Sequence, residues 1–190
     1  MDFLNDTLNK TRVPHSAICF EITETAAIAN FRMASRFISI MNAMGCRFAL
    51  DDFGSGMSSF SYLKNMLVDY LKIDGSFVKD MVDDPMDRAI VAAIHQVGHV
   101  LGIRTIAEFV EDDAIMAELN KIGVDYAQGY GIARPMEPDA MANWIQDWQP
   151  YPQWRNRPAV GRDDLPVLEQ CLRRSQRRRY LVERVVFLRD

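Results

Sequence analysis

The chain has 190 residues, of which 48% are hydrophobic and 25% are charged, and it carries a formal net charge of −4. This apolar fraction excludes an intrinsically disordered protein, and the length suffices for one domain with a core, or for one domain plus a tail. No stretch approaches ~18 consecutive apolar residues, so the sequence predicts no membrane span. The first residues lack the pattern of a secretory signal, and three scattered cysteines predict reduced thiols in a cytoplasmic compartment.

The charge is divided unevenly along the chain. Residues 151–190 contain ten arginines and five acidic residues, whereas the first 150 residues carry a balance of −9. A proline-broken segment follows Trp148, so we expect one domain over residues 1–148 and a linker with an arginine-rich helical tail over 149–190. Apart from Tyr180, the arginines lack interleaved aromatic residues, and we therefore expect a solvated helix face and no binding of DNA.

Short apolar runs alternate with longer segments of helical periodicity. Strands are predicted near 17–20, 48–50, 70–73, 104–107 and 126–127, and helices near 26–44, 57–66, 86–101, 112–121 and 137–148. This alternation predicts an α/β fold of parallel βα units, either an open doubly wound sheet or a TIM-like barrel. A whole barrel needs about 250 residues, so a barrel of about five units is incomplete. We expect no internal repeat.

Polar side chains stand at or just after the end of every predicted strand. They are Glu21, Asp51, Asp52, Lys72, Glu108 and Gln128. Because the carboxyl ends of parallel strands face one side, these groups are expected to converge there. The oxygen-rich set suits Mg²⁺ or Mn²⁺ better than zinc, and Lys72 offers a compact charge for a phosphate or an attacking water. The alternative, that such residues are only helix caps or solvated loops, stays open at this point.

A short glycine-containing loop follows the two aspartates. Gly54 and Gly56 predict a tight loop with positive φ angles and exposed backbone N–H groups. The segment is short and common in proteins, but its place directly after Asp51 and Asp52 indicates that it belongs to the same site.

At these motifs the sequence resembles the EAL-domain family of cyclic di-GMP phosphodiesterases. The matching segments are residues 20–25, 50–63, 71–74, 106–111 and 127–130, in the family's order and spacing, and the resemblance covers roughly residues 1–140. It implies a TIM-like barrel whose mouth binds cyclic di-GMP and uses Mg²⁺ or Mn²⁺ to hydrolyse it to linear pGpG.

The resemblance also implies roles for individual residues. The implied metal ligands are Glu21, Asp51, Asp52 and Glu108. The implied catalytic residues are Lys72, Glu108 and Gln128. The implied substrate-binding residues are Gln128 and Asp74. The residues implied to support the loop after the two aspartates are Glu24, Glu111, Gly54 and Gly56. The loop over residues 53–59 is implied to form a homodimer. We further expect a sensor or GGDEF-type domain upstream in the parent protein. We expect a cytoplasmic location, in a parent protein that could be tethered to a membrane.

The sequence departs from the family pattern in two ways. The namesake Glu-Ala-Leu strand, with its neighbouring arginine, and an asparagine ligand on a following strand are not found in these 190 residues, which leaves two metal ligands unaccounted for. Phe109 stands where the family often has glycine. An alternative is therefore a truncated or degenerate module that binds cyclic di-GMP or a protein without catalysis. We also expect such a chain to fold poorly alone, or to oligomerise through the gap in the barrel.

Overall fold

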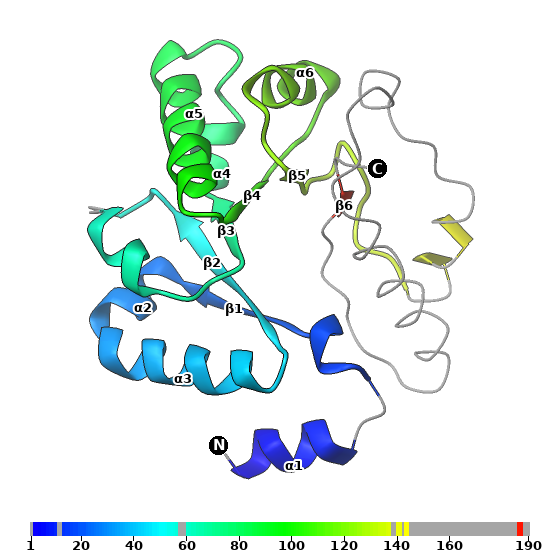
Figure 1. The fold of residues 1–190 in the computed structure, drawn as a ribbon. Helices are drawn as coiled ribbons and strands as arrows, with labels where there is room; N and C mark the ends of the chain where they lie inside the picture. Colours follow the sequence, from blue (N-terminus) through cyan, green and yellow to red (C-terminus); the bar gives the residue numbers. More distant parts are fainter. Residues whose placement is uncertain are drawn as a thin grey trace.

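A twisted sheet forms the centre of the molecule. The computed structural model describes residues 2–10, 13–56, 60–137, 140–141, 143–144 and 186–187. The strands lie side by side in chain order (Figure 1). They are β1 (Cys19–Thr23), β2 (Arg47–Phe53), β3 (Tyr70–Ile73), β4 (Arg104–Ala107), β5 (Tyr126–Ala127) and β6 (Val186–Phe187). The first five strands are parallel, and β6 pairs antiparallel with β5. The predicted α/β fold with about five parallel βα units is confirmed.

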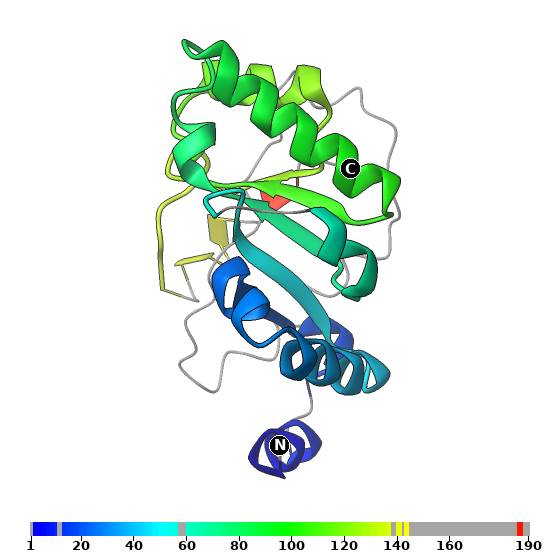
Figure 2. The ribbon, with the colours of Figure 1, turned by 90° about the vertical axis from the view of Figure 1, so that its left-hand side faces the viewer.

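Helices precede the first strand and connect the five parallel strands. They are α1 (Asp2–Lys10), α2 (Glu24–Ala29), α3 (Phe31–Ala43), α4 (Gly75–Val78), α5 (Pro85–Val100) and α6 (Asp113–Ile122), with 3-10 helices η1 (His15–Ala17) and η2 (Phe60–Asn65). Figure 2 shows α5 and α6 along one part of the sheet and α2 with α3 along another. Within the described part of the chain, no helix is both long enough and apolar enough to cross a membrane.

Several boundaries differ from the sequence expectations. The single helix expected near 26–44 is two helices, because Asn30 adopts a non-helical backbone (φ −134°, ψ 51°) between them. In place of the helix expected near 57–66, residues 60–65 form the 3-10 helix η2, and α1 and α4 were not expected. The helix near 137–148 lies largely outside the described residues.

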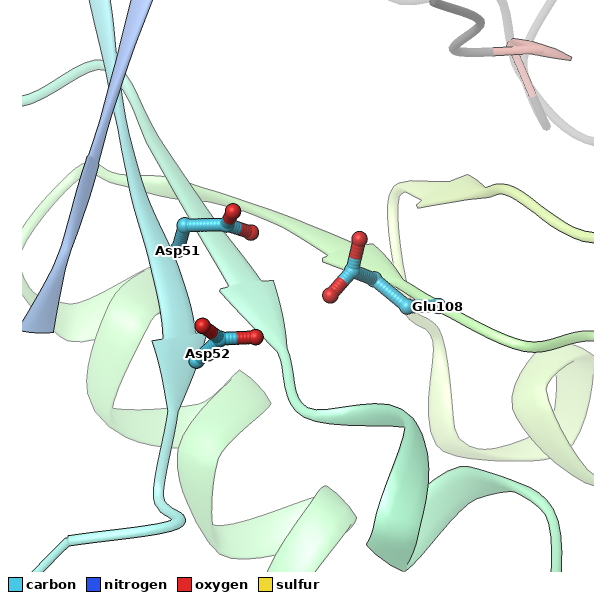
Figure 3. A group of neighbouring side chains, drawn as sticks. All are labelled: Asp51, Asp52 and Glu108. Atoms are coloured by element: carbon cyan, nitrogen blue, oxygen red, sulfur yellow. The ribbon is translucent and has the colours of Figure 1, made fainter.

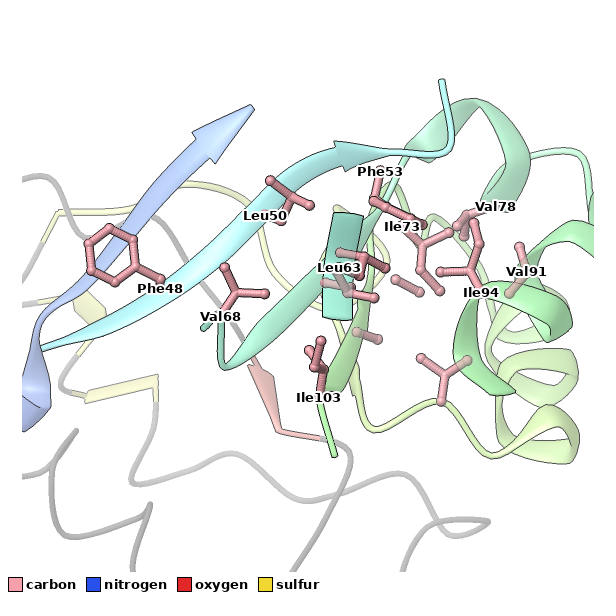
Figure 4. Packing of buried hydrophobic residues seen from close by; sticks show 14 of the residues in the cluster. Phe48, Leu50, Phe53, Leu63, Val68, Ile73, Val78, Val91, Ile94 and Ile103 are labelled. Atoms are coloured by element: carbon pink, nitrogen blue, oxygen red, sulfur yellow. The ribbon is translucent and has the colours of Figure 1, made fainter. Parts of the chain in front are cut away.

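The main core lies between the sheet and its helices. Among the outward-facing strand residues, Ile73 lies beside Val91 and Ile94 of α5 (Figure 4). Phe48 lies at the other end of β2, where its ring packs against those of Phe20 and Phe37. The other face of the sheet carries a separate small buried cluster, made of Ala49, Tyr70, Ile106 and Tyr126. Side chains alternate between the two faces of a strand, so the residues two positions further along each strand share this inner face. They are Asp51, Lys72, Glu108 and Gln128. An apolar layer therefore supports a polar layer, as inside a barrel.

The pair β2–β3 is built like the pair β4–β5, although we expected no internal repeat. Arg47 at the start of β2 donates a hydrogen bond to the hydroxyl of Tyr70 at the start of β3. In the same way, Arg104 at the start of β4 donates to the hydroxyl of Tyr126 at the start of β5. Both pairs tie the beginnings of neighbouring strands together.

A second interaction repeats in the two strand pairs. The carboxylate of Asp69, just before β3, accepts a hydrogen bond from the backbone N–H of Phe48 at 2.8 Å. The carboxylate of Asp125, just before β5, accepts one from the backbone N–H of Thr105 at 2.9 Å. Because both strand pairs are joined in the same way at their beginnings, their inward side chains lie at matching positions along the inner face.

The predicted linker and arginine-rich tail over 149–190 lie outside the described residues, apart from Val186 and Phe187. These two residues form strand β6 where a helix was expected. Their pairing with β5 covers the edge of the sheet opposite to β1.

Candidate active site

Lys72 lies at the centre of the polar layer on the inner face. Its side chain is only 4% exposed, and its Nζ lies 2.7 Å from Asp51 Oδ1, 2.9 Å from Glu108 Oε1 and 3.1 Å from Glu21 Oε2. These side chains come from β1, β2, β3 and the residue after β4, so four separate strands are needed to assemble the cluster. The predicted convergence of polar groups from successive strands is present in the structure.

Asp51, Asp52 and Glu108 form a group of carboxylates that face one another. One carboxylate oxygen from each residue lies within 4.8 Å of the others, and Figure 3 shows the three groups turned toward a common space. Glu21 stands beside this group and reaches it through Lys72. Hard oxygen ligands of this kind suit Mg²⁺ or Mn²⁺. Because one lysine faces several carboxylates, the negative charge is in excess, and a divalent cation fits the site.

The two aspartates lie inside β2 and not after it. Neighbouring side chains in a regular strand point to opposite faces, so Asp51 and Asp52 would normally diverge. Asp52 has a φ angle of +53°, in the left-handed region, and a register irregularity separates Leu50 from Phe53 in the pairing with β3. This local turn brings both carboxylates to the same side.

Burial and charge shift the ionisation of the cluster. Burial raises the pKa of Glu108, although the hydrogen bond and charge of Lys72 oppose the shift. Burial, followed by the charges of Asp51 and Asp74, raises the pKa of Asp52. For Lys72, burial alone would lower the pKa, but hydrogen bonds to Asp51 and Glu108 outweigh it and raise the pKa above its ordinary range. Lys72 therefore stays protonated beside two carboxyl groups, Asp52 and Glu108, whose pKa values are raised.

Glu24 holds the loop that follows β2. This residue is 2% exposed, and its carboxylate accepts hydrogen bonds from the backbone N–H of Gly54 at 3.1 Å and from the hydroxyl of Tyr62 at 2.5 Å. Burial and this hydrogen bond raise the pKa of Tyr62. Glu24 thus contacts the loop after β2, and the loop-supporting role that the resemblance implies for it stays a prediction. Tyr62 was not singled out from the sequence, because its contact with Glu24 spans 38 residues and leaves no local signal.

The two loop glycines differ in backbone conformation and in the space available for a side chain. Gly54 has a φ angle of +100°, and a Cβ there would lie 3.0 Å from Ile94 Cδ1 and 3.1 Å from Phe77 Cε2. Gly56 has no positive φ, and a Cβ there would make an ordinary contact of 3.8 Å with Glu24 Oε2. The expectation of positive φ angles is therefore correct for Gly54 and wrong for Gly56.

Three further candidates make no hydrogen bond or ion pair with the cluster among the contacts described, although the charge of Asp74 acts on Asp52. The carboxylate of Asp74 accepts a hydrogen bond from the backbone N–H of Ser76 at 2.7 Å and caps α4. Gln128 directly follows β5, and its backbone N–H donates to the carbonyl of Ala107 at 2.8 Å. Glu111 is exposed on the segment after β4. Substrate contacts for Asp74 and Gln128, and loop support by Glu111, stay predictions.

Residues 1–135 match the family model described as the EAL domain. The match covers more than half of the chain, and the chain therefore belongs to the EAL domain family. Among its relatives, the cyclic di-GMP phosphodiesterase PdeB of Shewanella oneidensis is 50% identical over 123 residues, which is 65% of this chain and 14% of that protein. The cyclic di-GMP phosphodiesterase PdeA of Borreliella burgdorferi is 41% identical over 133 residues, 70% of this chain and 20% of that protein.

Solved structures show the same architecture. The phosphodiesterase MucR of Pseudomonas aeruginosa in complex with c-di-GMP matches with a TM-score of 0.70 and 33% identity, over 74% of this chain and 57% of that one. Klebsiella pneumoniae BlrP1, in its manganese and cyclic di-GMP complex, matches with a TM-score of 0.66 and 30% identity, over 70% of this chain and 34% of that one. The chain thus spans about half of the MucR chain and a smaller part of the others, and its five parallel strands are part of an EAL-type barrel.

Proposed function

We propose that this chain supplies the metal-binding and water-activating part of a site that binds cyclic di-GMP and hydrolyses it to linear pGpG. The observation that carries the proposal is the buried Lys72 ammonium, held by carboxylates from β1, β2 and the end of β4. Relatives named as cyclic di-GMP phosphodiesterases and a matching structure that contains manganese and cyclic di-GMP support it.

The carboxylates are the proposed metal ligands. Asp51, Asp52 and Glu108, with Glu21 beside them, would hold Mg²⁺ or Mn²⁺. When bound between oxygen ligands, such ions lower the pKa of a water molecule and stabilise the charge that develops on a phosphoryl group. The excess negative charge of the cluster is the physical reason for binding a divalent cation here.

Lys72 and Glu108 are the proposed partners of the attacking water. The ammonium of Lys72 donates a hydrogen bond that orients the water, and the raised pKa of Glu108 suits a carboxylate that accepts a proton from it. The water oxygen forms a bond to phosphorus while one phosphodiester P–O bond breaks, and the ribose oxygen that leaves takes up a proton. Gln128 and Asp74 are proposed to contact the nucleotide.

We also propose a homodimer, a further domain in the parent protein and a location in the cell. We propose that the loop over 53–59 contributes to a homodimer; residues 57–59 lie outside the described residues. A sensor or GGDEF-type domain in a longer parent protein is supported by the relative MucR, which is named as a bifunctional diguanylate cyclase and phosphodiesterase. A cytoplasmic location follows from the same proposal, because cyclic di-GMP signalling takes place inside bacteria.

The test is hydrolysis of cyclic di-GMP by the full chain with Mn²⁺, followed by chromatography of the nucleotide products. We expect pGpG from the unmodified chain and at least a hundredfold slower product formation from Asp51→Asn and Lys72→Met. Lys79→Met is the matched control, because Lys79 is half exposed and pairs only with its neighbour Asp80, at 3.6 Å, among the ion pairs described.

The alternative of a binding module is decided by the same samples. Calorimetric binding of cyclic di-GMP without any pGpG would overturn the phosphodiesterase proposal and leave the nucleotide-binding one. Absence of both binding and product would overturn both.

A further inference from the structure

The carboxylate of Glu24 is buried, and none of the ion pairs found among the described residues involves it. Its two oxygens each accept one hydrogen bond from an uncharged donor. Oε2 accepts the backbone N–H of Gly54 at 3.1 Å, and Oε1 accepts the hydroxyl of Tyr62 at 2.5 Å. A buried carboxylate without a cation depends on such donors, and the loss of one leaves an oxygen unsatisfied.

The two donors come from opposite ends of one loop. Gly54 directly follows β2, and Tyr62 lies in η2. A Cβ at Gly56 would lie 3.8 Å from Oε2 of Glu24, so the chain also passes close to this oxygen between the two donors. Glu24 itself is the first residue of α2. One carboxylate therefore joins the beginning and the end of the loop to α2.

Packing fixes the ring of Tyr62 independently of its hydroxyl. The rings of Tyr62 and Phe31 meet edge to face, with their centroids 6.5 Å apart, and both side chains pack against the main core. Burial and the hydrogen bond to Glu24 raise the pKa of Tyr62, so the hydroxyl keeps its proton and acts as a donor. A phenylalanine at this position would thus keep the packing and lose the hydrogen bond.

The beginning of the loop is a turn that starts at Asp52. The carbonyl of Asp52 accepts hydrogen bonds from the hydroxyl of Ser55 at 2.8 Å and from its backbone N–H at 3.4 Å. Gly54 lies inside this turn, and its N–H is the group that Glu24 holds. Asp52 has a φ angle of +53°, a conformation that persists where surrounding contacts hold it. The bond from Gly54 to Glu24 is one such contact.

We propose that Tyr62 is a positioning residue for metal binding. Its hydroxyl keeps the Glu24 carboxylate directed at the N–H of Gly54, because two bonds fix the plane of the carboxylate and a single bond lets it rotate. The turn held in this way keeps the Asp52 carboxylate directed toward the other two carboxylates of the group (Figure 3). The inference rests on the proposed function, in which these three carboxylates hold the divalent cation.

The experiment titrates the full chain and its variants with Mn²⁺ by calorimetry. Tyr62→Phe is expected to bind Mn²⁺ about tenfold more weakly than the unmodified chain, as for other residues that orient a metal ligand. Tyr126→Phe is the matched control, because it also removes a buried tyrosine hydroxyl, which accepts a bond from Arg104 at the start of β4. This control is expected to stay within about twofold of the unmodified affinity.

A second readout needs no metal ion. The amide hydrogen of Gly54, followed by nuclear magnetic resonance, is expected to exchange with solvent about tenfold faster in metal-free Tyr62→Phe than in the unmodified chain. The amide of Val110, which donates to the carbonyl of Gln128 at 3.0 Å, is the internal control and is expected to keep its rate. In Tyr126→Phe the exchange rate of the Gly54 amide is expected to stay unchanged.

A double variant tests whether Tyr62 acts through Glu24. In a Glu24→Ala chain, Tyr62→Phe is expected to cause no further loss of Mn²⁺ affinity, because the residue that transmits the effect is already absent. Equal and independent losses from the two substitutions would overturn this route.

The remaining outcomes separate this inference from the proposed function. Unchanged Mn²⁺ affinity, or unchanged exchange of the Gly54 amide, in Tyr62→Phe would overturn the positioning role and leave the proposed function intact. The same would follow from an equal loss of affinity in Tyr126→Phe, or from a Tyr62→Phe chain that does not fold. An unmodified chain that binds no Mn²⁺ would overturn the proposed function, and this inference with it.

Discussion

At the scale of single residues, Lys72 acts as an internal counter-ion for the carboxylate cluster. It is almost fully buried, and it contacts Glu21, Asp51 and Glu108 within 3.1 Å. Removing one partner from a buried ion cluster leaves uncompensated charge in a poorly solvated place, which is costly. The same side chain that we propose to orient water is thus also needed to keep the inner face stable without a metal ion.

Lys72→Met is expected to destabilise the metal-free chain by about 3 kcal/mol, because three carboxylates lose their shared cation. Addition of Mn²⁺ is expected to restore part of the loss, since the ion supplies positive charge to the same oxygens. Chemical denaturation with and without Mn²⁺ measures both effects. The exposed control Lys79→Met should change stability by less than about 0.5 kcal/mol. Equal stability of Lys72→Met and the unmodified chain without metal would contradict the counter-ion role.

Metal affinity is expected to fall as the pH is lowered from about 7 to about 5. The folded chain raises the pKa of Asp52 and of Glu108 above their ordinary values of 3.8 and 4.5, so both carboxyl groups take up protons at a higher pH than the free side chains do. A cation must displace these protons, and affinity is therefore lost as the pH falls through the raised pKa values. Calorimetry of Mg²⁺ binding in buffers of different ionisation enthalpy measures the protons released. A flat affinity down to pH 5 would count against this linkage.

At the scale of elements, the conformation of the loop after β2 depends on one glycine, Gly54. Gly54 combines a positive φ with close approach to Ile94 and Phe77, and its N–H is held by Glu24. Through these contacts α2, α4 and α5 all meet the loop that follows the two aspartates. The position of Asp52 is thus coupled to three helices rather than to its own strand alone.

Gly54→Ala is expected to destabilise the fold by about 1–2 kcal/mol, because an L side chain is strained at φ +100° and its Cβ crowds two side chains. Gly56→Ala is the matched control two residues away, with only an ordinary contact, and is expected to cost less than about 0.5 kcal/mol. Thermal unfolding followed by circular dichroism compares the two. A similar loss in both variants would mean that the loop tolerates neither side chain, and that φ is not the deciding factor.

At the scale of the whole molecule, the described sheet ends at β1. The backbone N–H of Arg47 donates to the carbonyl of Ile18, so the alternate residues Phe20 and Ile22 turn their backbone groups toward β2. The backbone groups of Cys19 and Glu21 then point to the open side of the strand. Exposed strand edges favour pairing with a further strand, and oligomerisation through this side therefore stays our prediction.

Cys19→Pro is expected to weaken self-association of the chain, because it removes an N–H group from the open edge and leaves the β1–β2 ladder intact. Phe20→Pro is the contrasting variant: it removes a ladder hydrogen bond and is expected to lower stability by about 3 kcal/mol. Sedimentation velocity over a range of concentrations, in reducing buffer, measures the association. Unchanged association of a folded Cys19→Pro chain would exclude β1 as the contact.

Local sequence was sufficient for much of the fold. The bounds of β3, β4 and β5 agree with the expected 70–73, 104–107 and 126–127, because short apolar runs between helical segments are a strong local signal. The start of α5 follows from Pro85 and from the cap Asp84, whose carboxylate accepts the N–H of Met86. Polar residues at strand ends predicted a shared site, because parallel topology carries them to one side.

What the amino-acid sequence by itself determined was therefore the order of strands and helices, and the membership of the carboxylate and lysine set. Only the tertiary structure decided that Asp51 and Asp52 face the same side within β2, and that Lys72 is shared by three carboxylates. It alone revealed the equivalence of β2–β3 with β4–β5, and the hydrogen bonds of Gly54 and Tyr62 to the two oxygens of Glu24. These features depend on strand curvature, left-handed turns and contacts between distant segments, and such contacts leave no periodic trace along the chain.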